Sequence, residues 1–210
     1  MFDAAIRPLI DRPLAQMAER LVAWKISANS VTAMGFLLGM GAAGLIGSQQ
    51  YLAGLALFLL SRLLDGLDGA VARQTRLTDL GGYLDITLDF IVYASMVFAF
   101  ALADPVTNAL PAAFLTTSFM APAATFLAYA IIAAKRGITT EIRGKKSLYY
   151  LGGLTEGFET ILTLSLMCLL PAWFPVIAVV YALLCWITGG TRIAAAVQTF
   201  SQEEVSHDKS

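Results

Sequence analysis

Six long apolar stretches separated by short polar ones make up most of this 210-residue chain. Each is close in length to the roughly 20 residues that a helix needs to cross the hydrocarbon core of a bilayer. The pattern therefore predicts six transmembrane helices, at residues 30–48, 51–72, 82–103, 107–134, 148–170 and 174–196. The fourth stretch is longer than a span requires, so we expect this helix to tilt or to extend beyond the bilayer.

The N-terminal segment before these stretches has a different pattern. Between residues 2 and 24, apolar side chains recur at helical spacing opposite Arg7, Arg12 and Arg20, and Pro8 and Pro13 interrupt the pattern. A segment with one apolar and one basic face typically lies along a membrane surface rather than crossing it. We therefore expect an all-α integral membrane protein, in which an amphipathic surface helix precedes the six transmembrane helices.

The composition agrees with this class of protein. The chain is 58% hydrophobic and 14% charged, whereas soluble domains carry about 25% charged residues. We expect a juxtamembrane segment at 1–26, a six-helix membrane domain at 27–198 and a disordered polar tail at 199–210. The sequence shows no basic stripe with interleaved aromatics, so no nucleic-acid partner is expected. It also shows no cleavable signal pattern at its start.

The basic residues predict how the chain is oriented. None of the 14 Lys and Arg residues falls in the connectors around residues 48–50, 104–105 and 171–175. Cytoplasmic loops carry an excess of Lys and Arg. We therefore expect an integral protein of the cell membrane, with both termini on the cytoplasmic side of the bilayer.

Four aspartates lie within or beside the apolar stretches, namely Asp65, Asp68, Asp85 and Asp89. Each carboxylate at mid-bilayer opposes insertion by roughly 2.5–3.5 kcal/mol, so four without compensation would cost about 10 kcal/mol. A cation is therefore expected among them. By the orientation above, the cluster lies on the cytoplasmic side.

Helical spacing groups these carboxylates into two pairs. Asp65 and Asp68 share one face of the second span, about 4.5 Å apart along its axis, and Asp85 and Asp89 share one face of the third. Oxygen ligands suit hard divalent cations. The alternative is that the carboxylates only pair with nearby arginines at the membrane boundary, namely Arg62, Arg73 and Arg76.

Other candidate metal ligands are scarce. Cys168 and Cys185 lie in apolar stretches and are expected to be packing residues, and the single histidine, His207, lies in the predicted tail. A histidine-based metal site is therefore excluded.

The aspartates also form a motif. The pattern D-x2-D-G-x2-A-R, followed by G-x3-D-x3-D, resembles the signature of the CDP-alcohol phosphatidyltransferases. It is carried by Asp65, Asp68, Gly69, Ala72, Arg73, Gly81, Asp85 and Asp89. Seven residues separate Arg73 from Gly81, where the family commonly has eight. Taking Gly82 as the motif glycine restores eight but shortens the following gap, and a one-residue deletion in the loop is the simpler interpretation.

The resemblance implies an enzyme of phospholipid biosynthesis. In this family an acceptor alcohol attacks the β-phosphorus of a CDP-linked lipid, such as CDP-diacylglycerol, and CMP is released. The implied cofactors are two divalent cations, Mg²⁺ or Mn²⁺, and the implied assembly is a homodimer. Asp65, Asp68 and Asp85 would be the core metal ligands. Asp89 would be the general base on the acceptor hydroxyl and would also touch metal.

The resemblance also implies a donor-binding set. It comprises Asp65, Asp68, Gly69, Ala72, Arg73, Gly81, Asn29 and Thr32. The last two resemble a Pro-Asn-x-x-Thr element of the family, although Ala28 replaces the proline. Helix capping is the alternative role for them.

Two features point to different acceptors. The basic loop at 135–147 suggests a phosphorylated alcohol bound by Arg143 and Lys146, although a loop of this charge is also typical of the cytoplasmic side. Glu156 and Glu159 would favour an amine-bearing alcohol, unless they pair with a basic residue inside the bundle. The sequence leaves the acceptor open.

Two other functions agree less well with the sequence. A divalent-cation transporter would need polar residues across the bilayer, but the outer halves of the second and third spans are Ala, Leu, Phe and Val. A catalytically inactive scaffold of the same fold would be expected to have lost motif carboxylates, and all four are present.

Overall fold

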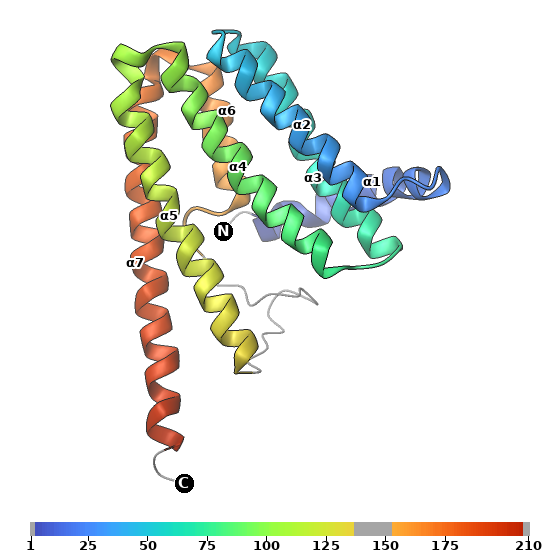
Figure 1. The fold of residues 1–210 in the computed structure, drawn as a ribbon, viewed down its shortest axis with the longest axis vertical. Coiled ribbons are helices and arrows are strands. Elements are labelled where there is room, and N and C mark those ends of the chain that lie inside the picture. The colour runs from blue at the N-terminus through green and yellow to red at the C-terminus, as the bar shows by residue number, and fades with distance from the viewer. Residues whose placement is uncertain (1–2, 137–152, 208–210) are drawn as a thin grey trace.

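The computed structural model describes residues 3–136 and 153–207, which form helices and short connections (Figure 1). In chain order the helices are α1 (Asp3–Ala23), α2 (Ala28–Gly47), α3 (Tyr51–Gln74), α4 (Asp79–Ala103), α5 (Pro105–Lys135), α6 (Gly157–Leu169), a 3₁₀ turn (Pro171–Trp173) and α7 (Phe174–His207). α5 packs against α7, and α2 packs against both α3 and α4. No strand occurs within these two described ranges, so the predicted all-α class is confirmed.

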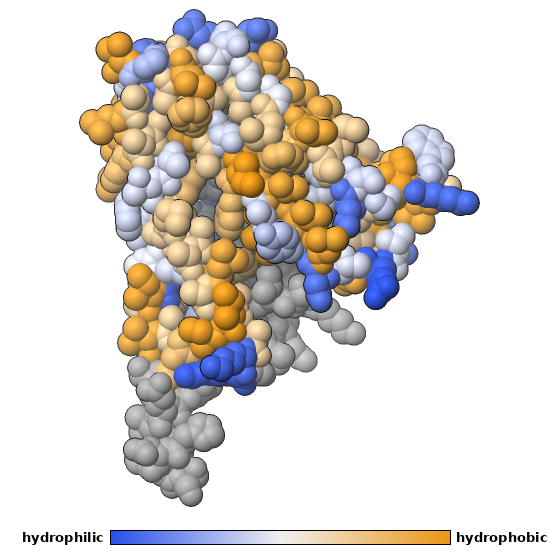
Figure 2. Space-filling view, viewed as in Figure 1, coloured by the Kyte–Doolittle hydropathy of each residue, from blue (hydrophilic) through white to orange (hydrophobic). Residues whose placement is uncertain are grey.

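Four segments of the described chain are long and apolar enough to cross a membrane: α2, α4, α5 and residues 171–200. Figure 2 shows apolar side chains over most of the visible face, with hydrophilic ones gathered around α1, at the upper end and near the lower end of α5. α3 has 24 residues but carries the charged residues of the predicted site. α6 has only 13, which as a helix measures about 20 Å against a hydrocarbon core of about 30 Å. The number of six transmembrane helices stays a prediction.

The predicted start of the fifth span, at residue 148, is not where α6 begins. Residues 153–156 lie before the helix, which starts at Gly157. Glu156 is its N-cap residue and accepts a hydrogen bond from the backbone N–H of Gly153 at 3.0 Å. Hydropathy gave no sign of this boundary, because the residues on both sides of it are mostly apolar or small.

The interruption expected at Pro8 and Pro13 is also wrong, since α1 runs through both residues. A proline removes one backbone hydrogen bond without preventing the flanking turns from forming theirs. Contacts with α3 support the helix. The side-chain amide of Gln74 donates to the carbonyl of Ala15 at 2.9 Å, and buried Leu14 lies against Gly66. Whether α1 lies along a membrane surface stays a prediction.

Small residues allow α2, α3 and α4 to approach one another closely, as is common between membrane helices. A Cβ atom at Gly54 of α3 would come within 2.6 Å of the Ile46 side chain on α2. One at Gly39 of α2 would come within 2.8 Å of Val92 on α4. Nearer the aspartates, the hydroxyl of Ser61 donates to the carbonyl of Gly35 at 2.7 Å. These contacts fix α2 relative to α3 and α4.

Aromatic packing joins the two halves of the bundle at the opposite end. Phe100 of α4 stacks on Phe174 of α7 with ring centroids 4.5 Å apart, and Tyr51 of α3 stacks on Phe100 at 5.7 Å. The side-chain amide of Asn108 closes the turn between α4 and α5 by donating to the carbonyl of Phe100 at 3.0 Å. The buried core is therefore continuous from α3 to α7.

The C-terminal helix is longer than predicted. α7 continues to His207, through most of the segment expected to be a disordered tail. Extending an existing helix adds one hydrogen bond for each residue fixed, so polar residues can continue it. Phe200, inside the predicted tail, packs on Tyr129 at 5.0 Å and lies under the Arg136 guanidinium at 4.9 Å. The end of α7 is thus held against α5.

Candidate functional site

The site is formed where α3 and α4 approach the short loop that joins them. Asp65 and Asp68 lie one turn apart on α3, and Asp85 lies on α4. Each of these three side chains offers a carboxylate oxygen that lies within 4.8 Å of those of the other two. The sequence pattern predicted the pair on α3, and the structure brings Asp85 to it from the neighbouring helix.

Asp68 is the most deeply buried of the three, with 5% of its surface exposed. Its Oδ2 accepts a hydrogen bond from the Thr32 hydroxyl of α2 at 2.5 Å. Hydrogen bonds to an ionised group are about twice as strong as those between neutral groups. Thr32 therefore fixes the orientation of the Asp68 carboxylate, and α2 becomes a third wall of the site.

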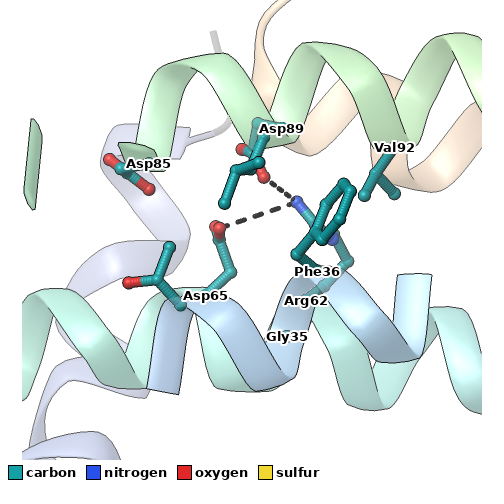
Figure 3. A pocket seen from close by; sticks show the side chains of 9 residues that line it. Gly35, Phe36, Arg62, Asp65, Asp85, Asp89 and Val92 are labelled. Atoms are coloured by element: carbon teal, nitrogen blue, oxygen red, sulfur yellow. Dashed lines mark hydrogen bonds and ion pairs between the residues drawn. The ribbon is translucent and has the colours of Figure 1, made fainter. Parts of the chain in front are cut away.

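Asp89 is not a member of this group of three. Its carboxylate forms an ion pair with the guanidinium of Arg62, whose Nη1 also lies 3.7 Å from Oδ1 of Asp65 (Figure 3). The Arg62 side chain is only 6% exposed. The four predicted aspartates thus divide into three that face one another and one that is held by an arginine.

The Arg62 side chain is enclosed by aromatic and polar groups. Its guanidinium lies 5.1 Å from the Tyr93 ring and 5.7 Å from the Phe58 ring, both within the range of cation–π attraction. Nη1 also donates to the Tyr93 hydroxyl at 3.3 Å, and Nη2 donates to the Ser61 hydroxyl at 3.0 Å. From the sequence, Arg62 was expected only as a possible ion-pair partner of the aspartates at the membrane boundary. Its spacing three residues before Asp65 was the signal that could have identified it.

A small pocket opens beside these charged groups (Figure 3). The volume of the pocket, including the part that is open to solvent, is about 200 Å³. One part of its lining is polar and another is apolar, and α2, α3 and α4 all contribute. The lining residues are Thr32, Gly35, Phe36, Arg62, Asp65, Asp85, Leu88, Asp89 and Val92.

The predicted donor-binding residues lie on the same three helices. A Cβ atom at Gly81 would lie 3.3 Å from Oδ1 of Asn29, so the start of α4 is packed closely against the start of α2. The Thr78 hydroxyl caps α4 by accepting from the backbone N–H of Gly81 at 3.1 Å. A Cβ atom at Gly69 would lie 3.4 Å from a guanidinium nitrogen of Arg73. Ala72 follows Gly69 by three residues on α3 and shares its side of the helix.

The predicted acceptor residues are not part of this pocket. Arg143 and Lys146 lie outside the described residues. Glu156 and Glu159 lie at the start of α6, and among the described residues neither lines the pocket beside the aspartates. Close to them, the hydroxyls of Thr160 and Tyr181 are 2.8 Å apart, which joins α6 to α7.

Comparison with known proteins gives one family. The family model described as CDP-alcohol phosphatidyltransferase matches residues 25–199. The inner membrane protein YnjF of Escherichia coli (strain K12) is 47% identical over 193 residues, which cover 92% of this chain and 94% of that protein. The archaetidylinositol phosphate synthase of Pyrococcus horikoshii is 39% identical over 99 residues, which cover 46% of this chain and 52% of that protein.

Solved structures show the same fold. The phosphatidylinositol phosphate synthase PgsA1 of Mycobacterium tuberculosis with CDP-DAG bound superposes with a TM-score of 0.70 at 20% identity, covering 89% of this chain and 94% of that one. A structure of the same protein in complex with manganese and citrate gives a TM-score of 0.66 at 21% identity, covering 86% and 87%.

Proposed function

This chain belongs to the CDP-alcohol phosphatidyltransferase family, and we propose that it transfers a phosphatidyl group from a CDP-linked lipid to an acceptor alcohol and releases CMP. As a member of the family it is a membrane-bound transferase of phospholipid biosynthesis. The observation that carries the proposal is the meeting of Asp65, Asp68 and Asp85 at carboxylate separations within 4.8 Å, from motif positions on two helices. The proposed donor is CDP-diacylglycerol, the lipid named in the solved structure of the mycobacterial enzyme.

The residues present fit a divalent cation. All three grouped side chains are carboxylates, and Mg²⁺ and Mn²⁺ prefer oxygen ligands. Mg²⁺ binds oxygen at about 2.0–2.1 Å, so small side-chain rotations would bring the three oxygens onto a shared ion. The proposed complement is two ions, Mg²⁺ or Mn²⁺, with Asp89 beside the second. When bound, such ions neutralise the diphosphate and stabilise the negative charge on departing CMP.

The acceptor hydroxyl must lose a proton as it reacts. We assign that proton to the carboxylate of Asp89, which lines the pocket and stands one helical turn from Asp85. The hydroxyl oxygen forms a new bond to the β-phosphorus of the donor. The bond from that phosphorus to the bridging oxygen breaks, and this oxygen leaves with CMP. The ion pair with the Arg62 guanidinium holds this carboxylate at the pocket.

The nucleotide of the donor is proposed to lie along the small residues at the ends of α3 and α4. Gly69, Ala72 and Gly81 present little side-chain bulk there, which allows a ligand to approach the backbone. Arg73, at the end of α3, is proposed to contact phosphate. Asn29 and Thr32 would complete the site from α2, Thr32 through its hydrogen bond to Asp68.

The acceptor is proposed to be a small alcohol or a phosphorylated alcohol. The phosphorylated class is supported by the names of two relatives, an archaetidylinositol phosphate synthase and a phosphatidylinositol phosphate synthase. Arg143 and Lys146 would then bind its phosphate. Glu156 and Glu159 would instead bind the amine of an amino alcohol. An acceptor screen separates the two classes.

The active site and both termini are proposed to lie on the cytoplasmic side of the cell membrane. The connectors without Lys or Arg, at residues 48–50, 104 and 170–173, gather at one end of the molecule in Figure 1. The loop between α3 and α4 lies away from that end. This arrangement supports the orientation that the positive-inside rule predicts. Relatedness to an inner membrane protein supports the location. A homodimer is proposed from the family alone.

The proposal is tested by supplying detergent-purified protein with CDP-diacylglycerol, Mg²⁺ or Mn²⁺ and a panel of alcohols. The panel includes inositol phosphate, glycerol phosphate and serine. CMP release is followed, and the lipid product is identified by mass. CMP release that depends on one class of acceptor supports the proposal. Absence of CMP with every acceptor and both metals would contradict it.

A further inference from the structure

One cation is already present among the aspartates. Arg62 pairs with Asp89 on α4 and lies 3.7 Å from Asp65 on its own helix (Figure 3). It is not one of the eight motif residues, which begin at Asp65. The family resemblance therefore gives it no role, and its position has to be explained from the structure.

The surroundings of Arg62 are those of a guanidinium held in one place. Its side chain is 6% exposed, with the Tyr93 and Phe58 rings beside it and the hydroxyls of Ser61 and Tyr93 as hydrogen-bond acceptors. The Ser61 hydroxyl is itself fixed to the carbonyl of Gly35. A buried charge is stable only when it is paired and hydrogen-bonded. Arg62 has an anionic partner in Asp89 and polar partners in Ser61 and Tyr93.

Two places for a cation follow from this geometry. One is bounded by Asp65, Asp68 and Asp85, whose oxygens lie within 4.8 Å of one another. The other lies between Asp65 and Asp89, where Figure 3 shows the Arg62 guanidinium. A divalent cation between Asp65 and Asp89 would compete with the guanidinium for the carboxylate oxygens of these two residues. It would also be repelled by the guanidinium at close range. One guanidinium cannot neutralise four carboxylates, so the position bounded by Asp65, Asp68 and Asp85 still favours a cation.

We propose that Arg62 fills the cation place beside Asp89, so that the donor-free enzyme binds one divalent ion per chain, on Asp65, Asp68 and Asp85. Asp89 is then held by the arginine and not by metal. Arg62 is a positioning residue for the proposed base. The inference rests on the proposed function. It implies that the second ion binds together with the donor, whose diphosphate supplies further oxygen ligands.

The experiment measures how many Mn²⁺ ions the full chain binds in detergent without any donor. Free Mn²⁺ is followed by its electron paramagnetic resonance signal during a titration. We expect one ion per chain for the wild type and two for Arg62→Met, which removes the guanidinium and keeps an apolar stem. Arg76→Met removes the same charge from an exposed position in the loop after α3, and we expect it to bind one.

Two further variants locate the second ion. Asp89→Asn is expected to bind one ion with an affinity within about twofold of the wild type, because Asp89 is not a ligand of the first ion. The double variant Arg62→Met/Asp89→Asn is expected to bind one ion, because the second ion needs both the vacated space and the Asp89 carboxylate. Circular dichroism and size-exclusion chromatography establish that each variant is folded.

Several results would overturn the inference. They are two ions in the wild type, one ion in folded Arg62→Met, two in the double variant, or Mn²⁺ binding at least tenfold weaker in Asp89→Asn. If Arg62→Met does not fold, the wild type and Asp89→Asn decide alone. None of these readouts requires turnover. Failure of CMP release would contradict the proposed function without changing the number of ions bound. A different number of bound ions would contradict this inference without changing whether CMP is released.

Discussion

The Thr32 hydroxyl of α2 lies 2.5 Å from Oδ2 of Asp68 on α3, inside the packed part of the bundle. Asp68 is buried, so its carboxylate is held by protein groups rather than by bulk solvent. A helix that carries no carboxylate of its own thereby sets the geometry of the acidic group.

The first prediction concerns this hydrogen bond. Thr32→Val keeps the shape of the side chain and removes the donor, which leaves the Asp68 carboxylate without its partner on α2. Loss of a partner that orients a metal ligand typically costs 10–100-fold in metal affinity or activity. We expect Mn²⁺ affinity and CMP release to fall by factors in that range. Thr32→Ser keeps the hydroxyl and should stay within about threefold of wild type; equal losses in both variants would contradict the assignment.

The second prediction concerns the proposed base. Asp89→Asn keeps the size of the side chain but cannot accept the proton of the acceptor. General-base catalysis contributes about 10²–10⁴-fold, so kcat for CMP release should fall at least 100-fold while the KM for the lipid donor changes little. Asp104→Asn, at the N-cap of α5 and outside the pocket lining, is the matched control and should retain wild-type activity. An Asp89→Asn enzyme that keeps more than about a tenth of the rate would rule out the role.

The third prediction concerns removal of metal. Stripping the purified enzyme with a chelator should abolish CMP release, because the carboxylates alone repel the donor diphosphate. Adding back Mg²⁺ or Mn²⁺ should restore the activity. The control is addition of the chelator already saturated with Mg²⁺, which should have no effect. CMP release that continues after stripping would show that the acidic group works without an ion.

The fourth prediction concerns packing between α2 and α3. Gly54→Ala places a Cβ atom 2.6 Å from the Ile46 side chain and 3.1 Å from the Ala42 carbonyl, so the helices must move apart. Overpacking of this kind costs about 1–3 kcal/mol. We expect a lower thermal unfolding midpoint in detergent. Gly44→Ala, on the exposed side of α2 with nothing within 4 Å, should leave the midpoint unchanged or raise it. The same loss in both variants would mean that contact is not the cause.

Much of the fold could be predicted because long apolar stretches have few alternatives in a membrane. The predicted ends of α2, α3 and α4 differ from the observed ones by a few residues. The start of α6 could not be predicted in the same way, because hydropathy does not separate a helix from an apolar turn. The continuation of α7 was missed for another reason, since a polar composition does not exclude a helix whose end packs on Tyr129.

The site was predictable to the extent that it depends on local spacing. Asp65 and Asp68 are three residues apart, which places them on one side of α3 whatever packs against it. Asp85 and Asp89 are also on one side of α4, yet the structure separates them: Asp85 groups with Asp65 and Asp68, whereas Asp89 pairs with Arg62. That choice depends on the rotation of α3 against α4 and on the rings of Phe58 and Tyr93. Neither can be read from a linear pattern.

The aspartate pocket is lined by α2, α3 and α4, whereas the proposed acceptor contacts lie between residues 143 and 159. Under this assignment, bond making and acceptor choice are encoded in separate parts of the gene. A substitution that admits a new alcohol leaves the phosphoryl-transfer machinery untouched. Under the same assignment, a change of acceptor requires substitutions only in the second half of the chain, and the four aspartates stay as they are.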